Sequence, residues 1–301
     1  MAGKINMYEE VTNKVLAALE AGTAPWRKSW KDTGVGGFRP PIRSNGEHYK
    51  GVNTLILWIV SQEKGYRSHR WMTYKQAAAM GGTVRKGEKA THICYFSVFT
   101  GEDKKTGKEK KIPFLKSYCV FNGDQVEWEE GNKYAAESTA NGGNAAPSPE
   151  KTAYFEGLDF RLIRGEPAYM PLSDTIRMPA ETEFESRERY LGTLSHELVH
   201  WTGAPHRLAR NLSGRFGDNA YGMEELTAEL GSAFVCGTLG IPLDVRDNAS
   251  YLASWIRTLK TDSKAIFTVA SAAAKAADFL TGTKAAEKEE VEAEEAEPAA
   301  A

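Results

Sequence analysis

The chain has 301 residues, of which 41% are hydrophobic and 26% are charged, a composition typical of globular proteins. This composition excludes collagen-like, mucin-like and wholly disordered chains, and the length is sufficient for two domains. The longest apolar run, residues 55–60, is too short to cross a bilayer, so we expect no membrane partner. The three cysteines lack metal or redox spacing and predict reduced thiols in a cytoplasmic protein.

The net charge of -2 hides an asymmetry between the two halves of the chain. Residues 1–120 carry 21 Lys and Arg against 10 Asp and Glu, a balance of +11. Residues 121–301 carry 17 against 30, a balance of -13. Such a split suggests that the halves have different partners, and the basic half is the candidate for binding nucleic acid. The alternative is a basic face that only contacts solvent.

Residues 1–130 predict a small α+β domain. Apolar spacing predicts helices over residues 8–19, 51–65 and 74–80 and strands over residues 91–99 and 114–121. Thr73 is placed to cap the third helix. The charged segment 101–111 contains a glycine and is expected to form a long hairpin loop.

Residues 131–151 are rich in Ala, Asn, Ser, Gly and Pro and predict a flexible linker. A mainly helical second domain is expected over residues 152–280. Its predicted elements are a strand over residues 174–178 and helices over residues 184–204, 223–239 and 250–280, the last with at least one break. Residues 281–301 are mostly Ala, Glu and Lys and predict an acidic disordered tail. The predicted fold class is therefore α+β, with two domains.

The strongest chemical signal is the run His196-Glu197-Leu198-Val199-His200 in the predicted helix 184–204. Residues four apart share one face of a helix, so both imidazoles can bind one divalent ion, Zn²⁺ or another such as Mn²⁺. Glu197 would then lie beside a metal-bound water and accept its proton. The run predicts a zinc-dependent metallopeptidase with Glu197 as the catalytic base. The alternative is a helix that presents two histidines by chance.

The third metal ligand has two candidates. His206 continues the spacing HExxHxxGxxH, in which Gly203 turns the chain, as in the metzincin pattern. Glu229 lies beside the apolar stripe of the predicted helix 223–239, where a buried carboxylate needs a partner such as a metal. Its position beside this stripe favours Glu229 as the third ligand. Glu225 lies one turn earlier and could hold a metal-binding side chain in place without binding the metal itself.

Aromatic and basic residues are interleaved in the first half, as in surfaces that stack bases and contact phosphates. Trp26, Arg27, Lys28 and Trp30 lie within one short run. The other candidate DNA-binding residues are Tyr49, Asn53, Trp71, Arg85, Lys86 and Lys89. The sequence contains no zinc finger or helix-turn-helix motif, which favours single-strand binding through charge and shape. The alternative is that several of these aromatic rings form the core of a small domain.

Several short runs in both halves match one family. They are PWRKSW (25–30), HYKGVNTLIL (48–57), WMTYKQA (71–77), GGTVRKGEKAT (81–91), CVFNGDQVE (119–127), AYMPLSDTIRMP (168–179), LSHELVHWTG (194–203), RLAR (207–210) and EELTAELGSAF (224–234). With these runs the chain resembles the ArdC-type antirestriction proteins of conjugative plasmids. The first half also resembles the start of some plasmid DNA primases.

The resemblance implies an N-terminal domain that binds single-stranded DNA without strong sequence preference and a C-terminal zincin-like metallopeptidase domain. It implies a role in protecting transferred plasmid DNA from the recipient's restriction enzymes, with a DNA-bound protein or a restriction enzyme as a further partner. In the family the residues after HELVHWTG vary, which makes His206 incidental and favours Glu229. The contrasting hypotheses are a DNA-binding module with a structural metal site and a peptidase with an incidental basic domain.

Overall fold

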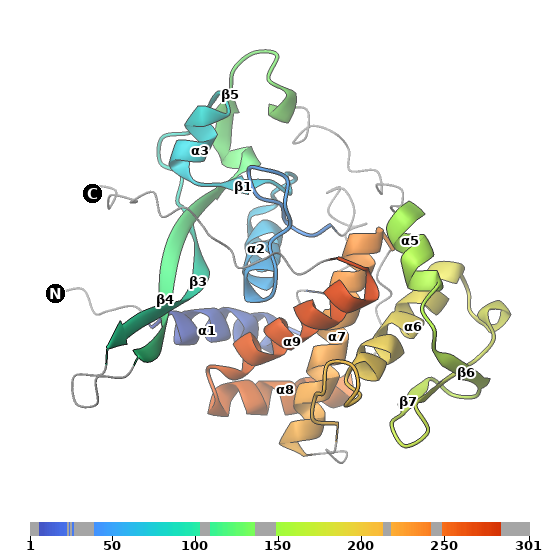
Figure 1. Cartoon of the computed structure of the whole chain (residues 1–301). Coiled ribbons are helices and arrows are strands. Elements are labelled where there is room, and N and C mark those ends of the chain that lie inside the picture. Colours follow the sequence, from blue (N-terminus) through green and yellow to red (C-terminus); the bar gives the residue numbers. More distant parts are fainter. Residues whose placement is uncertain are drawn as a thin grey trace.

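The computed structural model describes residues 6–22, 24, 26, 39–102, 109–135, 149–212, 218–241 and 249–283 (Figure 1). The elements of the first half are α1 (Met7–Glu20), α2 (Val52–Lys64), β1 (Trp71–Met72), α3 (Tyr74–Ala79), β2 (Gly82–Val84), β3 (Thr91–Glu102), β4 (Glu109–Asn122), the 3-10 turn η2 (Gly123–Gln125) and β5 (Val126–Trp128). Strands pair in the orders β1-β4-β3 and β2-β5. The predicted α+β class is confirmed.

Local signals in the first half set the helix ends. The side chain of Asn6 accepts a hydrogen bond from the amide of Tyr8 at the start of α1, and Thr73 and Gln76 form a capping box at the start of α3. Gly65 ends α2 with a left-handed φ of 67°, which glycine adopts without strain. The three predicted helices are confirmed.

The β3–β4 hairpin is longer than predicted. The two strands pair in antiparallel register from Thr91 opposite Val120 to Glu102 opposite Glu109. Residues 101–102 and 109–111 of the segment expected as a loop are therefore strand, because the backbone pairing of the hairpin continues through them. Residues 103–108 of the expected loop lie outside the described residues.

The elements of the second half are α5 (Pro149–Glu156), β6 (Arg161–Arg164), β7 (Ala168–Met170), β8 (Thr175–Met178), the 3-10 turn η3 (Glu181–Glu183), α6 (Arg187–Thr202), α7 (Asn219–Leu239), α8 (Ala249–Thr261) and α9 (Ala265–Leu280). The predicted strand and helices are confirmed, and the break expected in the last helix falls between α8 and α9. β8 is the middle strand of a sheet in which β6 is parallel and β7 antiparallel to it. We did not predict α5, β6 or β7; α5 begins inside the expected linker. Residues 136–148 of that linker and 284–301 of the expected tail lie outside the described residues.

The two halves share one hydrophobic core. Buried side chains of α1 and α2 belong to the same cluster as those of α6, α7, α8 and α9, with α1 packed against α8 and α2 against α9 (Figure 1). The rings of Trp58 in α2 and Phe234 in α7 have centroids 5.5 Å apart. Polar contacts add to this packing: Lys50 Nζ lies 2.8 Å from Asp278 Oδ2. The halves are therefore in direct contact as well as connected through the chain.

The helices α6 and α7 cross closely at one glycine. A Cβ atom added at Gly231 in α7 would lie 2.8 and 2.9 Å from the two Cγ atoms of Val199 in α6, closer than van der Waals contact allows. Val199 is fully buried and precedes His200 directly. The absence of a side chain at position 231 therefore lets the α7 backbone approach the helix that carries the histidines.

We predict that Gly231→Ala destabilises the protein by about 1–3 kcal/mol, because the added methyl group overpacks a rigid β-branched neighbour. Chemical denaturation monitored by circular dichroism measures this free energy. Gly192→Ala in α6 is the control: its Cβ would lie within 4 Å of none of the described atoms, and loss of a helical glycine should stabilise by about 0.5–1 kcal/mol. Unchanged or increased stability of Gly231→Ala would contradict the close crossing.

Candidate metal centre

The helix α6 presents two histidines on the face that meets α7. His196 and His200 are one turn apart, and the centroids of their rings lie 4.9 Å apart. Their side chains are only 12% and 13% exposed. The apolar side chains of Leu194, Leu198 and Val199 on the same helix are buried in the core. The prediction that both imidazoles share one face is confirmed.

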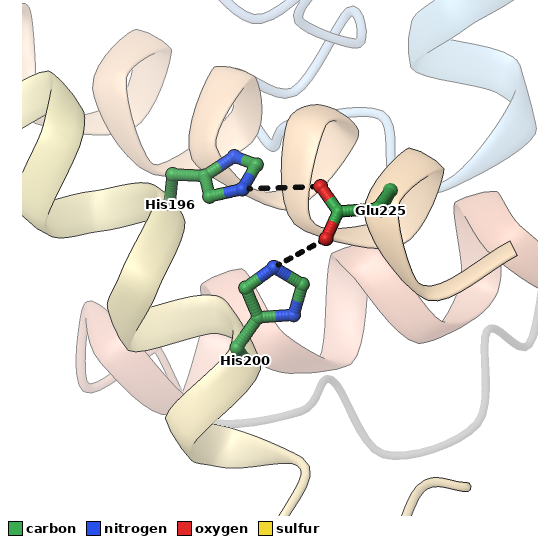
Figure 2. A group of neighbouring side chains, drawn as sticks. All are labelled: His196, His200 and Glu225. Carbon is green, nitrogen blue, oxygen red and sulfur yellow. Dashed lines mark ion pairs between the residues drawn. The ribbon is translucent and has the colours of Figure 1, made fainter. Parts of the chain in front are cut away.

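A glutamate of α7 lies between the two rings (Figure 2). Glu225 Oε2 is 3.6 Å from His196 Nε2, and Glu225 Oε1 is 3.5 Å from His200 Nε2. One ligand atom from each of the three residues lies within 4.8 Å of the others. Two imidazole nitrogens and a carboxylate are a donor set that suits Zn²⁺ and related divalent ions, so the residues fit a metal.

The grouping differs from the one expected from the sequence. Glu229, expected as the third ligand, has its Oε1 3.5 Å from His196 Nδ1, on the opposite side of the ring from Glu225. Glu225, expected as the supporting residue, faces both Nε2 atoms instead. Glu225 and Glu229 lie one turn apart on α7, and which of them faces the Nε2 atoms depends on the packing of α7 against α6, which helical spacing alone does not determine.

His206, the other candidate ligand, lies apart from this cluster. Its side chain is 63% exposed, and its Nε2 is 3.3 Å from Asp174 Oδ2 and 2.6 Å from Arg207 Nη1. Asp174 belongs to the turn between β7 and β8. The continued HExxHxxGxxH spacing therefore does not bring a third histidine to the site.

The histidines open onto a pocket with a volume of about 410 Å³. The described residues that line it include Ala168 and Tyr169 of strand β7, Tyr221 of α7 and Glu197 of α6. Glu197 is 5% exposed. The predicted catalytic base thus lies at the same pocket as both histidines.

The pKa values of two carboxylates at the site, Glu224 and Glu225, are lowered. Burial raises the pKa of Glu224. Hydrogen bonds from His200 and Arg210 lower this pKa by more than burial raises it, so the net shift is downward. Burial also raises the pKa of Glu225. Hydrogen bonds from His196 and Tyr221, together with the positive charges of both histidines, outweigh burial and lower this pKa overall. Ionised carboxylates are the form that binds a cation.

The second nitrogen of His200 is held by Glu224. Glu224 Oε1 is 3.1 Å from His200 Nδ1. Burial lowers the pKa of His200, but this hydrogen bond and the negative charges of Glu225, Glu224 and Glu197 raise it above its ordinary value. In the metal-free protein these carboxylates favour a protonated imidazole in the place that a cation would fill.

Three aromatic residues expected to stack on DNA bases are buried. Trp71 is fully buried, Trp26 is 1% exposed and Tyr49 is 6% exposed. The indole of Trp26 packs against Trp255 of α8, with ring centroids 6.1 Å apart. The expectation that these rings stack on bases does not fit their positions, because they fill the core.

Asn53, also expected to bind DNA, connects two elements of the first half. Its Nδ2 donates to the carbonyl of Cys94 at 2.7 Å, and its Oδ1 accepts from the amide of Cys94 at 2.8 Å. Both ends of the amide are therefore used to hold α2 against β3. The remaining candidates in the first short run, Arg27, Lys28 and Trp30, lie outside the described residues.

The basic candidates after β2 lie at the surface. Arg85, Lys86 and Lys89 are exposed, and Arg85 Nη2 lies 2.9 Å from Glu88 Oε1. Arg85 also donates to the carbonyl of Asp124 in η2. The side chain of Arg85 and the backbone of Lys89 therefore contact the η2 turn, and Lys86 is exposed in the segment between them.

An aromatic and basic cluster that we did not predict lies beside the same turn. The rings of Trp128 and Tyr134 have centroids 5.5 Å apart, and the cations of Arg70 and Lys133 lie 4.8 and 4.9 Å from the Tyr134 centroid. Trp128 Nε1 donates to the carbonyl of Gly123 at 3.2 Å. The run WEEGNKY (128–134) contains the same mixture of aromatic and basic residues. We did not select it from the sequence because it also contains two acids and borders the expected linker.

Within the part of the chain that the structure describes, none of the helices is long and apolar enough to cross a membrane.

Two family models match the chain. Residues 5–121 match the N-terminal domain of the anti-restriction factor ArdC, and residues 150–272 match a zincin-like metallopeptidase. Protein y4eC of Sinorhizobium fredii is 36% identical over 284 residues, covering 91% of each chain. The DNA primase TraC of Escherichia coli is 36% identical over 292 residues, but the match covers 27% of that longer protein.

Solved structures of the antirestriction protein ArdC from plasmid R388 are also similar. The metal-free crystal structure is 41% identical with a TM-score of 0.77, and the Mn(II)-bound structure is 40% identical with a TM-score of 0.74. Each match covers 93% of this chain and 98% of the other. The fold and site therefore define a two-domain protein with an ArdC-type N-terminal domain and a zincin-like metallopeptidase domain. The chain belongs to the ArdC family of antirestriction proteins.

Proposed function

We propose that the protein binds single-stranded DNA without strong sequence preference and carries a metal-dependent peptidase site. In this role it protects transferred plasmid DNA from restriction in the cytoplasm of the recipient cell. The observation that carries the peptidase half is the convergence of His196, His200 and Glu225 at a pocket that Glu197 also lines. The Mn(II)-bound structure of the R388 protein supports a divalent ion, with Zn²⁺ as the other candidate.

His196, His200 and Glu225 would hold the ion. When bound, a divalent ion polarises a peptide carbonyl and lowers the pKa of a bound water toward about 7. Glu197 is placed to take a proton from water at the pocket and to return it to the leaving amine. Glu229 faces Nδ1 of His196, so that its carboxylate keeps the Nε2 atom of that ring directed at the pocket.

The arrangement supports a catalytic site over a structural one. A structural zinc site is closed by four protein ligands, whereas a catalytic site has three and an open position. His206 is directed to Asp174, and Glu229 faces the nitrogen of His196 that points away from Glu225. The three converging donors at an open pocket are therefore the pattern of a hydrolase.

The DNA-binding half rests on the surface around η2. We define the η2 surface as Arg85, Lys86, Lys89, Trp128, Lys133 and Tyr134; the buried Arg70 packs against the ring of Tyr134. Its cations can contact phosphates, and its paired rings can stack on bases whose sequence does not matter. One acid beside these cations, Glu88, is already bonded to Arg85 and to Gln125, which reduces its repulsion of phosphate.

The assignment of the third ligand predicts a ranking of metal affinities. Glu225→Ala should lose metal binding, because it removes a direct ligand. Glu229→Ala should weaken binding by about 10-fold to 100-fold, because it removes an orienting partner. His206→Ala should bind as the wild type does. Competition with a chromophoric chelator measures all three, and metal retained by Glu225→Ala but lost by Glu229→Ala would reverse the assignment.

Glu197→Gln should keep the metal and abolish hydrolysis, because a neutral amide cannot accept a proton from water. The assay is cleavage of an unfolded protein such as casein, with and without single-stranded DNA, and metal analysis of the same sample is the control. Cleavage at the wild-type rate by Glu197→Gln would exclude it as the base. A wild-type protein that holds metal and cleaves nothing would support the DNA-binding module with a structural metal site.

The η2 surface predicts a salt-dependent interaction with single strands. The double variant Lys86→Glu/Lys89→Glu should bind a labelled oligonucleotide more weakly and with a shallower dependence on salt, because phosphate contacts are lost. Tyr134→Ala should lose about 1–3 kcal/mol of binding free energy through lost stacking. Fluorescence anisotropy measures both effects.

The control for this measurement is Tyr154→Ala, an exposed tyrosine of α5 in the second half of the chain. It removes the same ring away from the η2 surface and should leave the affinity unchanged. Equal affinity of the Tyr134 and Tyr154 variants would place the DNA-binding surface elsewhere.

A further inference from the structure

The run RLAR directly follows the histidine helix, and both of its arginines fold back onto the end of α6. Arg207 Nε donates to the carbonyl of Trp201 at 2.6 Å. Arg210 Nη2 donates to the carbonyl of Val199 at 2.5 Å, and Arg210 Nη1 donates to Thr202 Oγ1 at 2.8 Å. Carbonyls in the last turn of a helix lack helical partners, and cations there are favourable. Both arginines therefore stabilise the same helix end.

Each arginine also holds a carboxylate from another element. Arg207 binds Asp174 in the turn between β7 and β8 through both Nη atoms. Arg210 binds Glu224 in the first part of α7, with Nε 3.0 Å from Oε2 and Nη2 2.8 Å from Oε1. The side chains of Arg207 and Arg210 are only 8% and 12% exposed. Two-point contacts of this kind pair the opposite charges and also hold the guanidinium and the carboxylate in a defined orientation.

The two carboxylates differ in what else they contact. Asp174 accepts a hydrogen bond from the hydroxyl of Tyr169 at 2.9 Å and lies beside His206. Glu224 Oε1, in contrast, faces His200 Nδ1 at 3.1 Å. Arg210, Glu224 and His200 thus form a continuous chain of polar contacts that ends at a residue of the candidate metal centre.

We propose that Arg210 is a positioning residue for the metal site and acts through Glu224. Arg210 fixes the Glu224 carboxylate, the carboxylate keeps the proton of His200 on Nδ1, and the lone pair of Nε2 is thereby directed toward Glu225 and the pocket. The inference rests on the metal site of the proposed function. It gives the RLAR run a role that the HExxH spacing alone does not reveal.

Gly203 makes room for this contact. A Cβ atom there would lie 3.0 Å from Arg210 Nη2 and 2.8 Å from Leu212 Cδ2. The guanidinium therefore passes over the helix end where a side chain is absent. A lysine at position 210 has one ammonium group and cannot match this geometry, because it lacks the planar fork that bonds Glu224 twice.

The test uses the full chain and compares Arg210→Gln with Arg207→Gln. Both variants lose contacts to the end of α6 and one two-point ion pair, so both should lower the melting temperature of the metal-free protein. Arg210→Gln should weaken Zn²⁺ affinity by about 10-fold to 100-fold, as loss of an orienting partner does. Arg207→Gln should leave it unchanged. Arg210→Lys, which keeps the charge, should fall between the wild type and Arg210→Gln.

A second readout needs no metal. Long-range proton–nitrogen NMR spectra of the metal-free protein, recorded above the pKa of His200, report which ring nitrogen of His200 carries the proton. The wild type and Arg207→Gln should show the Nδ1–H form, and Arg210→Gln should show a mixture of both forms.

Wild-type Zn²⁺ affinity in Arg210→Gln, or equal loss of affinity in both glutamine variants, would overturn the proposal. The proposed metal site and the proposed role of Arg210 are contradicted by different results. A wild type that binds no divalent ion would contradict the proposed function, whereas an unchanged His200 tautomer in Arg210→Gln would contradict the role of Arg210.

Discussion

The site depends on the close crossing of α6 and α7 at Val199 and Gly231. Because of this approach, three glutamates of α7 each reach a defined side of the two imidazoles. Glu225 faces both Nε2 atoms, Glu229 faces Nδ1 of His196 and Glu224 faces Nδ1 of His200. Each ring is therefore held between carboxylates on two sides. This geometry fixes the orientation of both rings and brings several carboxylates close together. A divalent ion bound there would reduce the repulsion between these carboxylates.

The same helix connects the metal site to the other half of the protein. α7 carries Glu225 near its start and Phe234 further along, and Phe234 packs against Trp58 of α2. Lys50, two residues before the start of α2, pairs with Asp278 of α9. In our proposal a strand bound at the η2 surface and a peptide bound in the metal pocket would be held in a set relation by a shared core. A flexible tether would leave that relation free.

The sequence was sufficient for the helices with strong caps and for the HExxH histidines, because four-residue spacing on one helix determines that two rings share a face. It could not identify the third ligand. Glu225 and Glu229 are themselves four apart, so periodicity predicts their common face but not which turn meets α6. That choice depends on the helix crossing, a tertiary contact. Trp26 and Trp71 show a similar limit, since aromatic residues among cations are typical of both stacking surfaces and core anchors.

The charge of the site also constrains how a metal would bind. In the metal-free protein the pKa of His200 is raised by the surrounding carboxylates, which outweigh the effect of burial. A proton on His200 and a divalent ion therefore compete for the same negative environment. Metal affinity should be full above this raised pKa and fall as the pH drops through it, because the ion must then displace a proton. In our proposal Glu224 would take part in both states, because it would accept a hydrogen bond from Nδ1 whether Nε2 held a proton or a metal ion. The contact with Arg210 thus stabilises an imidazole orientation that suits both states.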